Sequence, residues 1–236
     1  MRNVESSQTY RVSIGNRIGR RIVRAVGRML YQLFARMKIT GLENVPADGA
    51  YIIACKPISI FEPTFILPFG PDAREALGAV EVWREPDKKI LAQMCGGIPL
   101  DRDEVCREAL MKAVQALRSR FALLMSPEGR LAWQPGSWRA KWIVAYLAEK
   151  ADVPGLPVGI VGSTGDFLKQ VISFTRPRLE MRIGMPVRLP ALAMVSQDRR
   201  EALRQYADRM MLHIAALLPA DYCGEYFEPF QNLQGA

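Results

Sequence analysis

The stretch "VCREALMKAVQALRSRFALLMSPEGR" (residues 105–130) decides the fold class of this 236-residue chain. Between residues 103 and 119, apolar residues recur on one side of a predicted helix, at Val105, Ala109, Leu110, Ala113, Val114 and Leu117. Residues 121–126 then form a continuous apolar run, which is typical of a strand buried on both faces of a sheet. A helix that leads into such a strand predicts an α/β fold.

The same alternation continues along the chain. Further buried strands are predicted over residues 51–55 and 155–163, with one or two more over 179–190. Helices are predicted over residues 63–69, 138–150 and 198–217, the first broken at Pro68. The tail after residue 218, with Tyr222, Tyr226, Phe227 and Phe230, is expected to fold back on the body. We therefore expect one α/β domain, residues 39–236, with helices on both faces of its sheet.

The composition narrows the function classes. A chain with 49% hydrophobic and 24% charged residues is globular. It contains no apolar run of the roughly 18 residues that span a bilayer, and no signal-peptide pattern, which predicts a cytoplasmic protein. The four cysteines contain no C-x-x-C pair and His213 is the only histidine, so we expect neither a metal site nor a bound cofactor. His213 itself is interpreted as a structural or surface residue.

The net charge of +8 belongs to the first segment of the chain, residues 1–38. This segment holds nine of the 32 basic residues and only one of the 24 acidic residues, Glu5, so the rest of the chain carries 23 of each. Residues 13–38 predict a helix with an apolar stripe at Ile14, Ile18, Ile22, Val26, Met29, Leu30, Leu33 and Met37. The other side carries Arg17, Arg20, Arg21, Arg24 and Arg28.

Two surfaces suit such a helix. It can pack its stripe on the protein and leave the arginines in solvent, or it can lie on an anionic membrane at the inner face, with the five arginines near the head groups. Nucleic acid suits it less, because no aromatic residues interleave with the arginines as base stacking needs, and no nucleic-acid partner is expected.

Four stretches lie at or inside the predicted strands, where α/β folds place ligand sites. They are "CKPISIFEP" (55–63), "GGIPLDRD" (96–103), "SPEGR" (126–130) and "VPGLPVGI" (153–160). Arg102 and Glu128 form a plausible pair near an anionic group, since arginine binds phosphate in a bidentate manner and a carboxylate can hold it in place. Taken singly, each stretch is also compatible with an ordinary turn.

In this order, and with the lead-in "GLENVPADG" (41–49), the stretches resemble the lysophospholipid acyltransferase superfamily, which includes the 1-acylglycerol-3-phosphate acyltransferases. The resemblance covers residues 39–190 and implies a mixed, mostly parallel sheet flanked by helices. It places a phosphate-handling role on Arg102, Glu128, Gly129 and Arg130. It also implies an acyl thioester, either acyl-CoA or acyl carrier protein, as co-substrate, and a lipid acceptor.

The chain departs from the family at the catalytic turn. Aligned on the motif N-H-x-S-x-x-D-P, "KPISIFEP" places Lys56 at Asn and Pro57 at the catalytic His, keeps Ser59, and places Glu62 at Asp. Proline has no ionisable side chain, so it cannot accept a proton. After "PEG", Arg130 and Leu131 occupy the Thr and Arg positions of the family.

Three hypotheses follow. The protein transfers an acyl group without the histidine, with Glu62 as the preferred replacement base and Lys56 and Ser59 as further candidates. Alternatively, it is an inactive relative that binds lipid, acyl-CoA or a protein partner in the inherited cleft. A third hypothesis is a related acyl transfer to a different acceptor that supplies its own base.

Overall fold

The computed structural model describes residues 14–47, 49–56, 65–66, 68–69, 73–79, 84, 89, 97–100, 107–128, 140–163, 166–188 and 199–222. The helices are α1 (Ile14–Phe34), α4 (Arg107–Arg118), α5 (Ile143–Ala151), α6 (Phe167–Ile172) and α7 (Arg199–Ala215), with short 3₁₀ turns η1 (Leu42–Asn44) and η4 (Ala220–Tyr222). The strands are β1 (Arg36–Thr40), β2 (Ile52–Cys55), β3 (Ala73–Ala79), β4 (Gly97–Leu100), β5 (Ala122–Met125), β6 (Gly155–Val161) and β7 (Arg178–Ile183).

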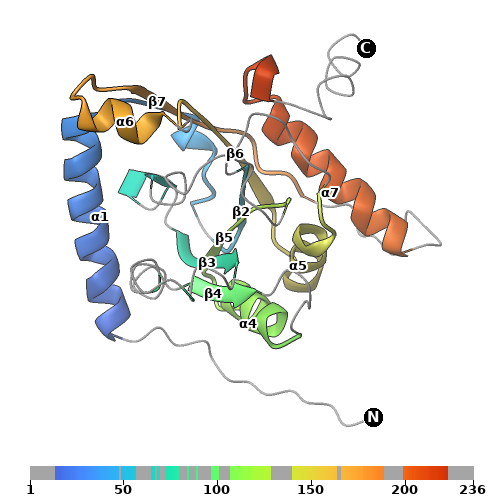
Figure 1. Ribbon diagram of the computed structural model, residues 1–236. Helices are drawn as coiled ribbons and strands as arrows, with labels where there is room; N and C mark the ends of the chain where they lie inside the picture. Colours follow the sequence, from blue (N-terminus) through green and yellow to red (C-terminus); the bar gives the residue numbers. More distant parts are fainter. Residues whose placement is uncertain are drawn as a thin grey trace.

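The described strands form one sheet in the order β1-β7-β6-β2-β5-β3-β4 (Figure 1). Neighbouring strands are parallel except β6 and β7, which run antiparallel. The central strands β2 and β5 are buried at every position. This confirms the prediction of a mixed, mostly parallel sheet flanked by helices.

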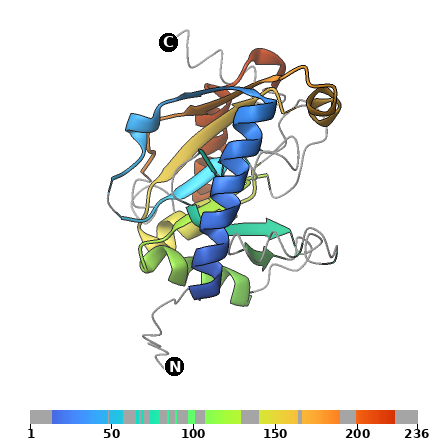
Figure 2. The same ribbon diagram turned by 90° about the vertical axis from the view of Figure 1, so that its left-hand side faces the viewer.

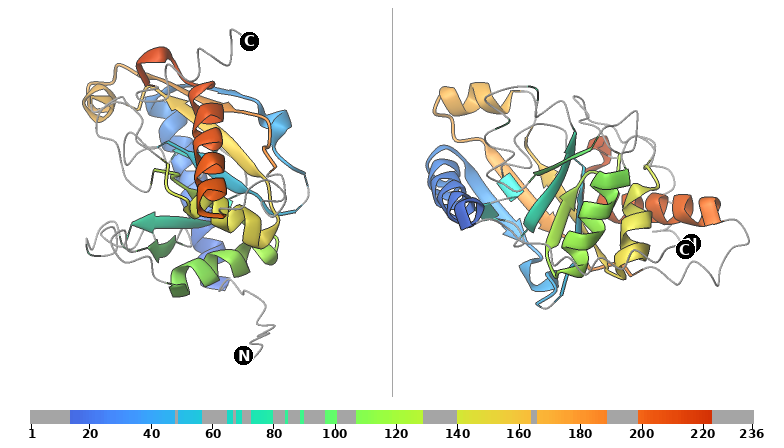
Figure 3. Two further views of the ribbon diagram at one scale, coloured as in Figure 1. Left: turned by 90° about the vertical axis from the view of Figure 1, so that its right-hand side faces the viewer. Right: turned by 90° about the horizontal axis from the view of Figure 1, so that it is seen from below.

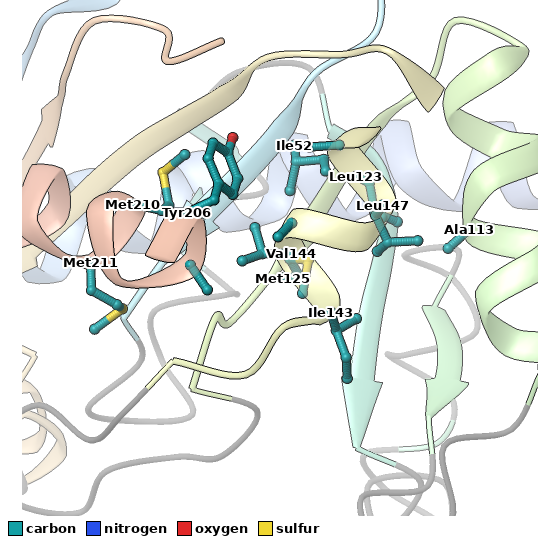
Figure 4. Close-up of a cluster of buried hydrophobic side chains, with 14 of the residues drawn as sticks. Ile52, Ala113, Leu123, Met125, Ile143, Val144, Leu147, Tyr206, Met210 and Met211 are labelled. Carbon is teal, nitrogen blue, oxygen red and sulfur yellow. The ribbon is translucent and has the colours of Figure 1, made fainter. Parts of the chain in front are cut away.

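Helices cover both faces of this sheet, as the view from below makes plain (Figure 3). On one face, α4, α5 and α7 pack over alternate residues of the central strands, and Figure 4 shows Ile52, Leu123 and Met125 meeting Val144 of α5 and Met210 of α7. On the other face, the intervening strand residues meet α1, α6 and the helical residues 65–66 and 68–69. The period of two along each strand therefore divides the core into two clusters.

The end of the first predicted helix differs from the structure. Helix α1 ends at Phe34, and residues 36–40 form the edge strand β1, paired with β7 from Arg36↔Arg178 to Thr40↔Arg182. Met37, which the sequence placed on the apolar stripe of the helix, is therefore a strand residue. Its side chain packs instead with the cluster under α1.

Helix α1 lies along the outside of the body (Figure 2), and the side of the helix that faces solvent is the apolar one, opposite to the usual amphipathic orientation. Its large apolar side chains point to solvent and are 44–61% exposed, at Ile18, Ile22, Val26, Met29, Leu30 and Leu33. The side that faces the body carries small, aromatic and basic residues. Of the two surfaces considered for this helix, the one with the apolar stripe packed on the protein is therefore wrong, and below we call these six residues the apolar stripe.

Three contacts hold α1 in this orientation. Arg20 forms an ion pair with the buried Glu75 of β3, at 2.8 Å between Nη2 and Oε1, with side chains 12% and 1% exposed. Arg28 donates a hydrogen bond of 2.7 Å from Nε to the carbonyl of Pro68. Tyr31 packs its ring against Phe65, with 5.2 Å between ring centroids.

None of the helices in the described part of the chain has the length and apolar character needed to cross a membrane.

Candidate active site

The register of the sheet brings three of the four motif stretches to one edge. In the register of the sheet, Leu124 of β5 pairs with Ile53 of β2 on one side and with Ala76 of β3 on the other. Ala76 in turn pairs with Gly97 of β4. Strand β5 ends one residue after Leu124, at Met125, which pairs with Ala54 of β2, and β2 ends at Cys55. Strands β3 and β4 end at Ala79 and Leu100, which pair with each other. The turns that follow β2, β5 and β4 contain "KPISIFEP", "SPEG" and "PLDR", so these turns leave the sheet from the same carboxyl edge.

The fourth stretch starts at the opposite edge. Gly155 pairs with Ile52, the first residue of β2, and the carbonyl of Pro154 accepts a hydrogen bond from the Ile52 N–H at 3.0 Å. "VPGLP" thus begins strand β6 at the amino edge of the sheet. Its role here is to place β6 beside β2, because Leu156 and Val158 are completely buried in the core under α1.

Lys56 is the first residue of the candidate catalytic turn, and it is buried. Its Nζ donates a hydrogen bond to the carbonyl of Tyr222 in η4. The hydroxyl of the same tyrosine accepts a hydrogen bond of 3.4 Å from the N–H of Gly162, just after β6. Tyr222 thereby ties the carboxyl ends of β2 and β6 together, which confirms that this part of the tail folds back on the body.

Of the two acidic candidate residues, Glu62 and Glu128, the described residues include Glu128, the side chain of which is buried, with 1% exposed. It follows β5 by three residues, and the preceding Pro127 carbonyl accepts a hydrogen bond of 2.8 Å from the N–H of Lys141 before α5. A buried carboxylate is stable only near cations or donors. Lys56, one residue after the neighbouring strand β2, is a second buried charged residue at the carboxyl edge of the sheet.

The other candidate residues lie outside the described residues. They are Pro57, Ser59 and Glu62 of the catalytic turn, Arg102 after β4, and Gly129 and Arg130 after β5. The structure therefore brings together the strand ends that carry them. Their side-chain placement stays a prediction.

The structure assigns different surroundings to the five arginines of α1. Arg20 faces the body and pairs with Glu75, and Arg28 bonds to Pro68. Arg21 points to solvent, Arg24 is half-buried, and the side chain of Arg17 lies outside the described residues. Reasoning from the sequence missed Glu75, because an acid inside "AREALGA" carries no sign that it will be buried in a strand.

Helix α1 lies directly on the chain that follows the catalytic turn. Gly27 allows this approach, because a Cβ placed on it would lie 2.8 Å from Cγ of Pro68. Beside it, Tyr31 contacts the rings of both Phe65 and Phe69. The helix and the segment that carries residues 65–69 are thus packed as one layer. Among the described residues, no group of three or more His, Cys, Asp or Glu side chains could hold a metal ion.

Comparisons with known proteins agree with this arrangement. The family model for "Acyltransferase" matches residues 36–161, from the start of β1 to the end of β6. The crystal structure of the 1-acyl-sn-glycerophosphate (LPA) acyltransferase, PlsC, from Thermotoga maritima is similar over 94% of this chain and 82% of that chain, with a TM-score of 0.63 and 19% identity. No curated protein sequence matches the chain significantly. The family model matches more than half of the chain, and the strands that carry the motifs end at one edge of the sheet. This chain therefore belongs to the acyltransferase family.

Proposed function

We propose that this protein transfers an acyl group from an acyl thioester, acyl-CoA or acyl carrier protein, to a hydroxyl of a lysophospholipid-like acceptor at a membrane surface, without a histidine base. The observation that carries the proposal is the convergence of three motif-bearing turns at the carboxyl edge of an acyltransferase-family sheet. In this reaction the acceptor oxygen attacks the thioester carbonyl, a C–O bond forms and the C–S bond breaks. The hydroxyl proton leaves with the thiol.

Each side chain has a distinct part in the proposed mechanism. Glu62 takes the proton of the attacking hydroxyl, since a carboxylate with a raised pKa is an effective base near neutral pH. Arg102 binds the acceptor phosphate, and the buried Glu128 orients the basic groups around it. Lys56 donates a hydrogen bond to the carbonyl of Tyr222, so in this mechanism it supplies positive charge near the site and does not act as the base. Proximity supplies a further part of the rate enhancement.

In this proposal, α1 is the element that binds the membrane surface. The apolar stripe faces outward, and the helix carries five arginines and no acidic residue. Such a helix can bury its apolar side among acyl chains while Arg21, which points to solvent, meets anionic head groups. Because α1 lies on the segment after the catalytic turn, a lipid acceptor in the bilayer would reach the site over a short path.

The test is an assay of the purified protein with acyl-CoA or acyl carrier protein and a series of lysophospholipids on vesicles. Thiol release and the new ester, measured by mass spectrometry, report turnover. We expect Glu62→Gln to lower kcat by about 10²–10⁴-fold, and Arg102→Ala to raise KM for acceptors that carry a phosphate. Glu108→Gln and Arg107→Ala, on the exposed start of α4, are matched controls that leave turnover unchanged.

One observation favours the second candidate, an inactive relative that binds lipid, acyl-CoA or a protein partner. Pro57 stands where the family has its base, and Lys56 beside it is already engaged by Tyr222. The double variant Pro57→His with Glu62→Asp separates the two. If the parent shows no turnover with any acceptor while the double variant gains it, the acyl-transfer proposal is refuted and the binding role takes its place.

A further inference from the structure

A second exposed apolar site is formed by Ile172, the last residue of α6, and Phe174 in the turn that follows. Ile172 is 67% exposed and Phe174 is 75% exposed, more than any residue of the apolar stripe. The turn lies beside the carboxyl end of α1, on the same side of the molecule (Figures 1 and 2). Large exposed apolar side chains are costly in water, so an isoleucine and a phenylalanine two residues apart indicate a surface that is covered in use.

The turn holds these two side chains in a fixed position. Phe174 has a φ of 54°, a left-handed conformation that a residue with a Cβ adopts only at some energetic cost. The conformation is fixed by hydrogen bonds from the N–H groups of Ser173 to Lys169, Phe174 to Val171 and Thr175 to Gln170. The hydroxyl of Thr175 adds a bond of 2.9 Å to the carbonyl of Gln170. The ring is therefore presented by a closed turn.

The turn is also attached to α1. The ring of Phe174 packs on Phe34, with 5.7 Å between centroids, and Arg176 donates a hydrogen bond of 3.0 Å to the carbonyl of Gln32. Phe34 lies one helical turn after Leu30, on the border of the apolar stripe. Ile172 and Phe174 thus extend the stripe sideways at its carboxyl end.

We propose that Ile172 and Phe174 are a second lipid-inserting point that enters the same anionic bilayer as α1 and fixes the orientation of the protein on it. The inference rests on the membrane binding proposed above. A helix of 21 residues is about 30 Å long and by itself could roll about its axis on a membrane. A point beside the axis prevents that rolling, and so keeps the segment under α1 at one angle to the lipids.

The charges around this face favour lipid over a second copy of the chain. The exposed cations around this face include Arg21 and Arg28 on α1 and Arg176 in the turn after α6. Three further cations already have acidic partners: Arg20 pairs with Glu75 at 2.8 Å, Lys169 of α6 with Asp166 at 3.2 Å, and Arg178 of β7 with Glu180 at 2.8 Å. Two copies joined through this face would bring the exposed cations together. An anionic bilayer offers apolar chains and negative head groups to the same surface.

The experiment uses the full chain with vesicles of phosphatidylcholine and phosphatidylglycerol, the acyl chains of which carry bromine. Phe174→Trp keeps an aromatic side chain in the turn. We expect bromine to quench the fluorescence of this variant more than that of the parent with its four tryptophans. Met185→Trp is the matched control, because Met185 is 68% exposed at the other end of β7, and its added tryptophan should gain no quenching.

Binding is measured in parallel by co-sedimentation with vesicles. We expect Ile172→Ser with Phe174→Ser to lower partitioning by roughly tenfold, whereas Met185→Ser leaves it unchanged. If Ile22→Ser with Leu33→Ser on α1 abolishes binding while the double turn variant binds as the parent does, the second insertion point is refuted and the α1 proposal stands. Absence of quenching, combined with a dimer in ultracentrifugation that the turn variant dissociates, overturns the inference in favour of self-association.

Discussion

At the scale of single residues, Glu180 shows how this fold holds a buried carboxylate between two arginines, on the strand next to the edge strand β1. Its carboxylate in β7 accepts from Arg182 at 2.9 Å and pairs with Arg178 at 2.8 Å. The hydrogen bond from Arg182 lowers the pKa of Glu180 below its ordinary value of 4.5, against burial, which raises it, and the charges of Arg178, Arg182 and Lys38 add to the lowering. The carboxylate therefore stabilises the folded chain while it is ionised.

This gives a pH-dependent prediction for Glu180→Gln. Because the pKa is lower in the folded state, the stabilisation is present above pH 4.5 and is lost as the pH falls through the folded-state pKa. We expect the variant to be less stable by about 1 kcal/mol at neutral pH, and the difference to disappear in acid. Urea unfolding at a series of pH values measures it, with Glu43→Gln on the exposed η1 turn as the control. A difference that persists in acid would show that packing, and not charge, is responsible.

At the scale of elements, the close approach of α1 depends on Gly27. Alanine has the better helix propensity, by about 1 kcal/mol, so on an isolated helix Gly27→Ala would stabilise. Here its Cβ would meet the ring of Pro68 at 2.8 Å, and a proline ring cannot move aside. We expect Gly27→Ala to destabilise the protein and to reduce protection of the α1 amides in hydrogen exchange, whereas Val26→Ala on the exposed side retains that protection. A stabilised Gly27→Ala would contradict the packing described here.

The elements also show what a sequence can and cannot predict. Strands β2, β5 and β6 were predictable, because strands buried on both faces leave continuous apolar runs. Strand β3, "AREALGA", was missed, because its alanines and charges favour helix, and an ion pair with Arg20 on a distant helix helps to make Glu75 tolerable inside the sheet. Strand β1 was missed for a similar reason: "RMKIT" continues the basic pattern of α1.

The same limit applies to the candidate site. Its motif blocks were predictable from their order, and the register of β2, β5 and β4 accounts for their convergence. The contact between Lys56 and Tyr222 was not predictable in detail, because it joins residues 166 positions apart through a carbonyl that leaves no mark in the sequence. The direction in which α1 faces was also not predictable, since an amphipathic pattern gives the two sides of a helix but not which side meets the body.

At the scale of the whole molecule, the exposed Arg21 is next to Ile22 of the apolar stripe on α1, and the effects of the two residues on membrane binding should separate with salt. We expect Arg21→Gln to weaken binding to phosphatidylglycerol vesicles at low salt and to matter little at high salt, where charges are screened. Ile22→Ser with Leu33→Ser should weaken binding at every salt concentration. Co-sedimentation over a range of sodium chloride measures both, with Arg107→Gln on α4 as the charge control. Equal salt dependence of Arg21→Gln and the parent would remove Arg21 from the binding surface.

The placement of Tyr31 has a practical consequence for handling the protein. An exposed apolar stripe invites removal of α1 to obtain a soluble sample. That deletion would also remove the Tyr31 ring, which packs on Phe65, Phe69 and Phe167. It would therefore replace one exposed apolar surface with another that promotes aggregation. Serine substitutions confined to the stripe leave Tyr31, the Arg20–Glu75 pair and the Gly27 contact in place, so they are the better route to a well-behaved sample for crystallisation.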